Sequence, residues 1–205
     1  MQYKKYKKLY ISYFLTGLVL FVSIYILYKN GAIIPFDKYL SSYVKYIQQR
    51  NISAIVIPLT HLNSPPALFS FTVALSIILF VRKHKIASFS LLVSIAATAT
   101  MTTVAKNLIE RARPTEKLVE ISSHSFPSWH ASTSMALAIA LAWIFRGSRL
   151  SVVVMLWPLA IGFSRIYLNA HWASDVLAGW GLGLSVSSLT ILIFIWIEAK
   201  ISHRR

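Results

Sequence analysis

Long apolar runs alternate with short polar segments along most of this 205-residue chain. The first run, residues 9–28, contains no charged residue and matches the roughly 20 residues that a helix needs to cross the hydrocarbon core of a bilayer. It is too long for the apolar region of a signal peptide, so we expect it to remain as a membrane anchor. Further apolar runs, each limited by charge, proline or a polar loop, cover residues 66–81, 86–104, 129–145, 150–163 and 176–197. The pattern predicts an all-α bundle of six transmembrane helices, formed by one domain over residues 1–205.

Residues 33–50 follow a different pattern, in which apolar and polar side chains recur with the period of a helix. Six apolar positions share one face, namely Phe36, Tyr39, Leu40, Tyr43, Val44 and Ile47. The opposite face carries Asp37, Lys38, Ser41, Ser42, Lys45 and Gln48. A short amphipathic helix of this kind is typical of the membrane interface, where it is placed to guide a substrate. A helix packed as a cap on the bundle has the same pattern, so both interpretations stay open.

The Lys and Arg residues indicate an orientation, because cytoplasmic loops carry the excess of positive charge. With the N-terminus inside, 12 of the 21 fall on the cytoplasmic side: Lys4, Lys5, Lys7, Lys8, Arg82, Lys83, Lys85, Arg146, Arg149, Lys200, Arg204 and Arg205. We therefore expect a multi-pass protein with both termini in the cytoplasm. Loops 29–65, 105–128 and 164–175 then face the periplasm or exterior. Their compactness is typical of a bacterial cytoplasmic (inner) membrane protein.

The amino-acid composition bears on the class of partner that the protein binds. A formal net charge of +15 is typical of a nucleic-acid binder, but 56% of the residues are hydrophobic and only 13% are charged. The basic residues are explained by membrane topology, so no nucleic-acid partner is expected, and the bilayer is the expected surroundings. The absence of cysteine removes thiolate metal ligands and cysteine nucleophiles.

The chemically versatile side chains gather in two of the outer loops. Near membrane depth these loops offer Lys106, Arg113, Ser128, His130, Arg165, His171 and Asp175. Ionisable groups at this depth are costly and tend to be functional. The set suits a phosphoryl group, because guanidinium and ammonium groups bind phosphate oxygens and histidine supplies a nucleophile or an acid. Ser128 is expected to cap the fourth span, which leaves backbone N–H groups directed at an anion.

Three spaced motifs resemble those of the type 2 phosphatidic acid phosphatase (PAP2) superfamily of membrane lipid phosphatases, which shares its site with vanadium haloperoxidases. The matching positions are Lys106 with Arg113-Pro114, then Pro127-Ser128-Trp129-His130, then Ser164-Arg165 with His171 and Asp175. Each block alone is weak, but three blocks in the right order with the right spacing are specific. Together with the six-span layout the resemblance covers most of the chain.

The resemblance implies a role for each matching residue. His171 would attack phosphorus and form a phosphohistidine, and Asp175 would orient it. His130 would protonate the leaving oxygen and then activate water. Lys106, Arg113, Arg165 and the Ser128 hydroxyl would hold the phosphate, so that no metal or other cofactor is needed. A metal site at His171 and Asp175 is disfavoured because the neighbouring cations would repel a divalent ion.

Trp129 departs from the family pattern, which usually has glycine at this position. Its backbone N–H can still point at an anion, while the indole packs at the interface, narrows the pocket and alters the head groups admitted, or impairs activity. No functional role is expected for His61, His84, His124 and His203. Glu110, Arg111 and Lys117 are expected to be solvated loop charges, with Arg111 in reach of a large head group. Gly179, Gly181 and Gly183 predict close helix packing.

The predicted substrate is an amphiphile, because a site between helix ends can take a lipid phosphate laterally. The candidates that the resemblance implies are undecaprenyl pyrophosphate, phosphatidylglycerol phosphate, phosphatidic acid and the phosphates of lipid A. Phosphotransfer to another lipid by the same site stays open. So does a transporter or flippase that binds the head group without cleaving it, although no inverted repeat supports that alternative. The sequence does not choose among these lipids, and it gives no oligomeric state.

Overall fold

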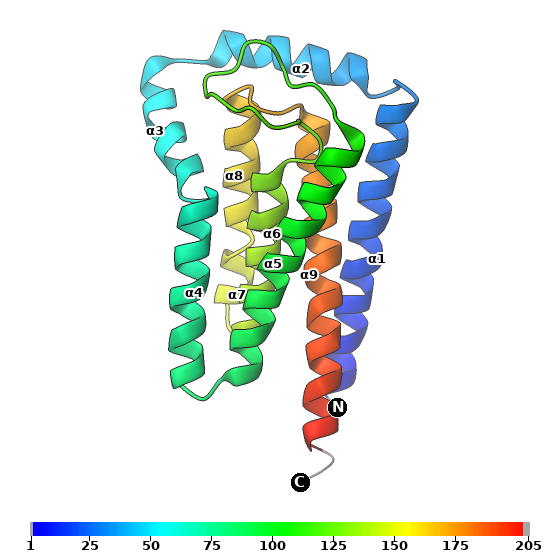
Figure 1. The fold of residues 1–205 in the computed structure, drawn as a ribbon, viewed down its shortest axis with the longest axis vertical. Helices are drawn as coiled ribbons and strands as arrows, with labels where there is room; N and C mark the ends of the chain where they lie inside the picture. Colours follow the sequence, from blue (N-terminus) through cyan, green and yellow to red (C-terminus); the bar gives the residue numbers. More distant parts are fainter. Residues whose placement is uncertain (1, 203–205) are drawn as a thin grey trace.

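The computed structural model describes the backbone of residues 2–202 and the side chains of residues 6–201. His203, Arg204 and Arg205 therefore lie outside the described residues, and so do the side chains of Lys4 and Lys5. Within the described part every regular element is a helix (Figure 1). The helices are α1 (Gln2–Lys29), α2 (Ile34–Ile47), α3 (Arg50–His61), α4 (Pro65–Val81), α5 (Lys85–Ile109), α6 (Trp129–Ile144), α7 (Leu150–Val153), α8 (Leu156–Tyr167) and α9 (Ala173–Ser202).

All six predicted apolar runs lie in helices, and four segments of the described chain are long and apolar enough to cross a membrane. These are α1 from Tyr6 onward, α5, the pair α7–α8 and α9 up to Ile201. The pair α3–α4 passes the same test together but bends by 49°, which would make a fifth span. Helix α6 is apolar but has only 16 residues. The structure is therefore an all-helical bundle with four or five candidate spans.

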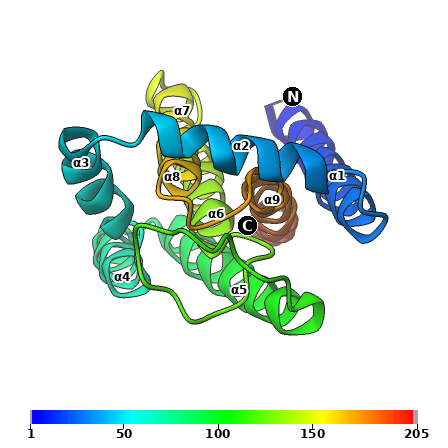
Figure 2. The ribbon, with the colours of Figure 1, turned by 90° about the horizontal axis from the view of Figure 1, so that it is seen from above.

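Helix α6 occupies the centre of the bundle, with α4, α5, α7, α8 and α9 around it (Figure 2). Its sequence is rich in alanine, serine and threonine, and residues on all sides of it are buried. A helix buried all round has no amphipathic stripe, because it has no face toward solvent or lipid. Helix α1 packs along α9, and α4 packs on α5. The site-bearing helices α5, α6, α8 and α9 are thus held against one another.

The predicted close packing of Gly179, Gly181 and Gly183 is confirmed. A Cβ at Gly181 would lie 2.8 Å from the carbonyl oxygen of Gly17, and one at Gly179 would lie 2.7 Å from that of Ser128. Both distances are too short for any side chain, so α9 approaches α1 and α6 with backbone against backbone. The contact at Gly179 fixes the start of α6 against the first turns of α9, where the candidate site lies.

Helix α2 lies across one end of the bundle (Figures 1 and 2), and the predicted facing of its side chains is partly wrong. Asp37, expected on an outward polar face, is buried, and Ser41 donates a hydrogen bond of 2.7 Å to Asn169 Oδ1. By contrast, Tyr39 and Tyr43 of the predicted apolar face are 70% and 51% exposed, while Val44 of the same face is buried. The reason is that α2 covers a partly polar surface, so that Asp37 and Ser41 face inward together with Val44.

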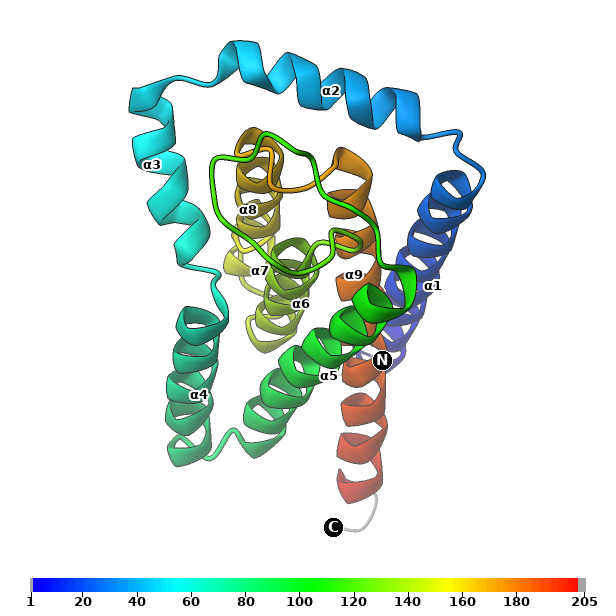
Figure 3. The ribbon, with the colours of Figure 1, turned by 45° about the horizontal axis from the view of Figure 1, so that its top comes forward.

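Helix α3 was not predicted, because residues 29–65 were expected to form a loop beyond the amphipathic helix. Residues 50–61 contain the internal Pro58 and begin with the charged Arg50, which obscure a helical pattern. Between α5 and α6, residues 110–128 form an irregular segment that folds back over the helix ends beneath α2 (Figure 3). Backbone hydrogen bonds hold it there, from Leu118 N to Leu168 O and from Ser125 N to Arg111 O.

Candidate active site

The predicted site residues meet at the end of the bundle that α2 covers. Lys106 lies in the last turn of α5 and Arg165 in the last turn of α8, while His130 and Asp175 lie in the first turns of α6 and α9. A cavity of about 450 Å³ opens between these helix ends. Six of the predicted residues line it: Lys106, Arg113, Trp129, His130, Arg165 and His171. The structure thus brings together residues that are up to 65 positions apart in the motifs, from Lys106 to His171.

The three cations of the cavity are held by neutral oxygen atoms. Lys106 Nζ donates to the carbonyl oxygen of His124 at 2.6 Å, and Arg165 Nη1 donates to Thr60 Oγ1 at 2.9 Å. Arg113 donates to the carbonyl oxygens of Ser123 and Ala170, each at 2.6 Å. Among the described residues none of the three cations forms an ion pair, and the buried Nε of Arg165 has no hydrogen-bond partner. Their positive charge is therefore left for an anion in the cavity.

His171 is buried, and its contacts decide which ring nitrogen carries the proton. Arg113 Nη1 lies 2.9 Å from His171 Nε2, and a guanidinium group can only donate. Nε2 must therefore accept, which places the proton on Nδ1, 3.4 Å from Asp175 Oδ2. Burial, and then the charge of Arg113 and the other cations, hold the pKa of His171 well below its ordinary value. The ring is neutral near pH 7, with the lone pair of Nε2 on the cavity side.

Asp175 lies behind His171, away from the cavity. Its Oδ2 accepts hydrogen bonds from the Ser125 hydroxyl and from the backbone N–H of Trp172 at 3.0 Å. Its Oδ1 accepts from Arg111 Nη1 at 2.7 Å. A fully buried carboxylate needs such partners, because an unpaired charge away from water is very costly. The carboxylate is thus fixed where it can orient the imidazole.

The prediction that Arg111 is a solvated loop charge is wrong, because only 5% of the residue is exposed. Its Nη2 donates to Asp37 Oδ2 at 2.6 Å while Nη1 binds Asp175. The guanidinium plane lies between the rings of Tyr28 and Trp172, with its carbon 4.4 Å and 5.5 Å from the two ring centres. The irregular segment folds back over the bundle and carries Arg111 with it. Arg111 therefore ties α2 to the first turn of α9.

Ser128 caps α6 as predicted, since its Oγ accepts a hydrogen bond from the backbone N–H of Ala131 at 3.4 Å. Its own N–H donates to the carbonyl oxygen of Asp175 at 2.9 Å. The residue is fully buried and lies behind the cavity wall. It positions the start of α6, where the residues Trp129 and His130 face the cavity.

Trp129 forms part of the cavity wall. Its indole packs on a buried apolar cluster that includes Leu68 of α4 and Leu91 of α5, and it meets the His130 ring edge-on with centroids 5.6 Å apart. His61, for which no role was predicted, also lines the cavity. His124 contributes only its backbone carbonyl oxygen, which accepts from Lys106 and Arg113. The geometry favours the indole as a determinant of pocket shape.

A family model described as the PAP2 superfamily matches residues 87–199, more than half of the chain. The chain belongs to the PAP2 superfamily. The matched region contains α6, α7 and α8 and nearly all of α5 and α9, and with them every residue that lines the cavity from Thr103 onward. The two ends of the chain, including α1 and α2, lie outside the match.

Several PAP2 relatives resemble the chain over most of its length. Phosphatidylglycerophosphatase B of Bacillus subtilis is 26% identical over 85% of this chain and 89% of its own. An undecaprenyl-diphosphatase of Sulfolobus acidocaldarius is 27% identical over 90% of this chain and 91% of its own. The crystal structure of a PAP2-type phosphatidylglycerolphosphate phosphatase from Bacillus subtilis superposes with a TM-score of 0.78 at 26% identity, covering 94% of this chain and 96% of the other. The names of all three of these proteins describe phosphatases.

Proposed function

We propose that this PAP2 protein is a metal-independent phosphatase that hydrolyses a lipid phosphate or pyrophosphate through a phosphohistidine at His171. The observation that carries the proposal is the neutral imidazole whose Nε2 faces a cavity lined by three cations, none of which is ion-paired with a residue that the structure describes. A phosphate group in this cavity would meet a nucleophile and positive charge together. The names of the relatives support the same class of substrate.

The proposed reaction has two displacements at phosphorus. In the first, the lone pair of His171 Nε2 forms the N–P bond while the P–O bond to the lipid breaks, and His130 passes a proton that the phosphate monoanion brings into the cavity to the departing oxygen. In the second, His130 takes a proton from water, which attacks phosphorus and releases His171. Asp175 stabilises the positive charge that the imidazole gains, as in other carboxylate–histidine pairs.

The negative charge on the phosphate oxygens is stabilised by Lys106, Arg113 and Arg165. Arg113 must move its N–H from His171 Nε2 to a phosphate oxygen when substrate arrives, which frees the nucleophile at the same moment. Arg165 has an unpaired buried Nε ready to donate. Preorganised donors of this kind stabilise charge on the equatorial oxygens without reorganisation during the reaction.

The proposed substrate enters laterally with its tail in the bilayer. The cavity is bounded by Ser64 and Pro65 at the start of α4 and by Thr103 and Asn107 near the end of α5. A cavity with residues of two outer helices in its wall suits an amphiphile, whose phosphate would reach the cations while its chain stays among lipids. Phosphatidylglycerol phosphate, undecaprenyl pyrophosphate, phosphatidic acid and lipid A phosphates all remain candidates, and phosphate release from a panel of these four lipids would rank them.

For the topology we propose six spans in one domain, with the central α6 as a sixth span beside α1, α3–α4, α5, α7–α8 and α9. The excess of Lys and Arg supports an orientation with both termini in the cytoplasm and the cavity on the outer face of the cytoplasmic membrane. Helix α2 would lie in the outer interface, with its exposed tyrosines among head groups. Because the chain has no cysteine, Tyr46→Cys and Arg149→Cys each introduce a single thiol, and the side of the membrane from which that thiol can be labelled reports its location. Only the one at Tyr46 should react with an impermeant maleimide added outside.

The test of function is phosphate release from a lipid phosphate in detergent with EDTA present. Release should persist in EDTA and vanish in His171→Ala, whereas His124→Ala is the matched control because only its backbone carbonyl contacts the site. Release from the lipid with transfer to a second lipid would indicate a phosphotransferase. Binding without release in the wild type would favour a transporter, and a wild-type rate in His171→Ala would refute the mechanism.

A further inference from the structure

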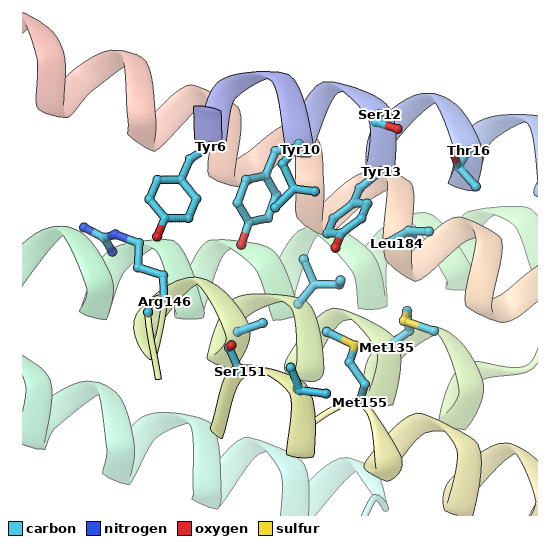
Figure 4. Close-up of a pocket in the computed structure, with 15 residues that line it drawn as sticks. Tyr6, Tyr10, Ser12, Tyr13, Thr16, Met135, Arg146, Ser151, Met155 and Leu184 are labelled. Carbon is cyan, nitrogen blue, oxygen red and sulfur yellow. The ribbon is translucent and has the colours of Figure 1, made fainter. Parts of the chain in front are cut away.

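A second large cavity lies at the opposite end of the bundle from the candidate active site. It has a volume of about 600 Å³ and runs between α1 and the helices α6 and α7, with α9 contributing to its wall (Figure 4). Ala142 of α6, which lines it, is 12 residues beyond His130, or about 18 Å along the axis of α6 at 1.5 Å per residue. No residue lines both cavities, so this groove is separate from the site described above.

Three tyrosines of α1 share one face of that helix, and their hydroxyl groups point into the groove (Figure 4). These are Tyr6, Tyr10 and Tyr13. The rings of Tyr6 and Tyr10 meet Trp143 edge-on, with centroids 5.9 Å and 5.6 Å apart, which fixes their direction. Tyr10 is only 3% exposed, yet none of the three hydroxyls has a hydrogen-bond partner among the described residues. These hydroxyls line the groove and are not engaged within the described part of the chain, so they can donate to a ligand there.

Arg146 stands at the end of the groove nearest the start of α1. Its guanidinium carbon lies 3.9 Å from the ring centre of Trp143, and Nη1 donates to the Trp143 carbonyl oxygen at 3.1 Å. Its Nη2 forms a long salt bridge of 4.0 Å with Glu198 Oε1, which is beyond hydrogen-bond distance, and 35% of the Arg146 side chain is exposed. The stacking holds the cation in place while N–H groups remain for an anion at the groove's mouth.

The dimensions of the groove fit one leaflet. Its wall on α1 extends from Tyr6 to Thr16, which is about 15 Å along the helix, and half of a hydrocarbon core of roughly 30 Å is the same length. Beyond the tyrosines the lining is mostly apolar and adaptable, with Met135, Ile139 and Met155 beside a single hydroxyl residue, Thr16. The groove therefore has a cation at one end, hydroxyl donors next to it and apolar side chains beyond them. The parts of a glycerophospholipid occur in the matching order, which is phosphate, ester oxygens and acyl chain.

We propose that this groove binds one anionic glycerophospholipid from the leaflet opposite the active site. Its phosphate lies at Arg146, its glycerol ester oxygens accept from the tyrosine hydroxyls, and one acyl chain lies along the two methionines. The lipid is a bound partner and not a substrate, because among the described residues that line the groove there is no histidine or carboxylate to activate its serine and threonine hydroxyls. The proposal is independent of the reaction proposed above.

Lipid retention tests the proposal. Delipidated protein in a mild detergent is titrated with phosphatidylglycerol or phosphatidylcholine, and bound lipid is counted by native mass spectrometry, with saturating inorganic phosphate to occupy the active site. Wild type should retain one phosphatidylglycerol about tenfold more tightly than phosphatidylcholine. Arg146→Gln should remove that preference, and Tyr10→Phe with Tyr13→Phe should weaken both lipids several-fold. Arg149→Gln is the matched control, because it removes the same charge from the same end but does not line the groove.

A second measurement does not depend on removing groove contacts. Ala142→Cys places a lone thiol in the groove, and Val19→Cys places one on the exposed side of α1. Phosphatidylglycerol should slow maleimide labelling at position 142 several-fold, phosphatidylcholine should slow it less, and neither should affect position 19. Equal protection by both lipids, or equal losses in Arg146→Gln and Arg149→Gln, would overturn the proposal. Equal protection would mean that any lipid fills the groove without recognition of its head group. Equal losses would mean that the general positive charge at this end of the bundle attracts the lipid, and not Arg146 in particular.

Discussion

Replacing Arg111 by glutamine should damage both the fold and the site, because this side chain neutralises two buried carboxylates at once. Asp37 and Asp175 are 1% and 0% exposed, and Arg111 contacts them at 2.6 Å and 2.7 Å. In Arg111→Gln both carboxylates lose their charged partner but keep their place away from water. Arg111→Lys should be nearly as harmful, since a single ammonium group cannot reproduce the fork that bridges the two.

The magnitude follows from the burial of the pair. Removing one partner of a buried ion pair costs about 3–5 kcal/mol, and Arg111→Gln should lower the free energy of unfolding by that amount. Asp37→Asn in the same chain removes one of the uncompensated charges. The loss of unfolding free energy in the double variant should therefore be about 1–3 kcal/mol smaller than the sum of the losses in the two single variants. A displaced Asp175 misplaces His171, for which a loss of about 10²-fold in kcat is typical.

The assay combines unfolding in detergent micelles with turnover of a lipid phosphate. Since Asp175 and Arg111 lie behind His171, the loss should appear in kcat more than in KM. Lys117→Gln, which removes a charge from the same irregular segment, should stay within about 0.5 kcal/mol of wild type. Stability within about 1 kcal/mol of wild type and kcat within about twofold for Arg111→Gln would refute the role given to this network.

Three other predictions concern the site and the packing beside it. Burial and Arg113 hold the pKa of His171 below its ordinary value of about 6.5, so the acid-side fall of kcat/KM, where this ring gains a proton, should lie below that pH; in Arg113→Gln the acid-side fall should move to higher pH, and an unmoved acid side would contradict this. Trp129→Gly should change the relative rates among the four candidate lipids, whereas a uniform large rise would mean that the indole impairs activity. Gly181→Leu should lower the melting temperature strongly by forcing α9 from α1, and an unchanged melting temperature would contradict the close contact.

The parts of the fold that the sequence predicted are those that depend on neighbouring residues. The six apolar runs are helical because hydropathy over about 20 residues is a local property. The cap at Ser128 was predictable for the same reason, since it depends on the residue before the helix. The placement of Lys106, His130 and Arg165 at one level followed from their positions at helix ends.

The parts that were missed depend on contacts between distant segments. Arg111 and Asp37 are 74 residues apart, and a lone charge in a loop sequence carries no signal of a buried partner. Helix α2 was amphipathic as expected, but amphipathicity alone does not say which face looks inward when the surface below is polar. The contacts of Ser125 and Thr60 with Asp175 and Arg165 escaped prediction because any hydroxyl residue could have made them.

The central claim is that phosphate passes through His171, and trapping the intermediate tests it most directly. Protein mixed with a ³²P-labelled lipid phosphate is quenched in alkali within one turnover, and the labelled peptide is mapped by mass spectrometry. The account predicts acid-labile label on His171, absent from His171→Ala and present in His124→Ala. Label on any other residue, or steady release of phosphate with no labelled protein at any time, would contradict it.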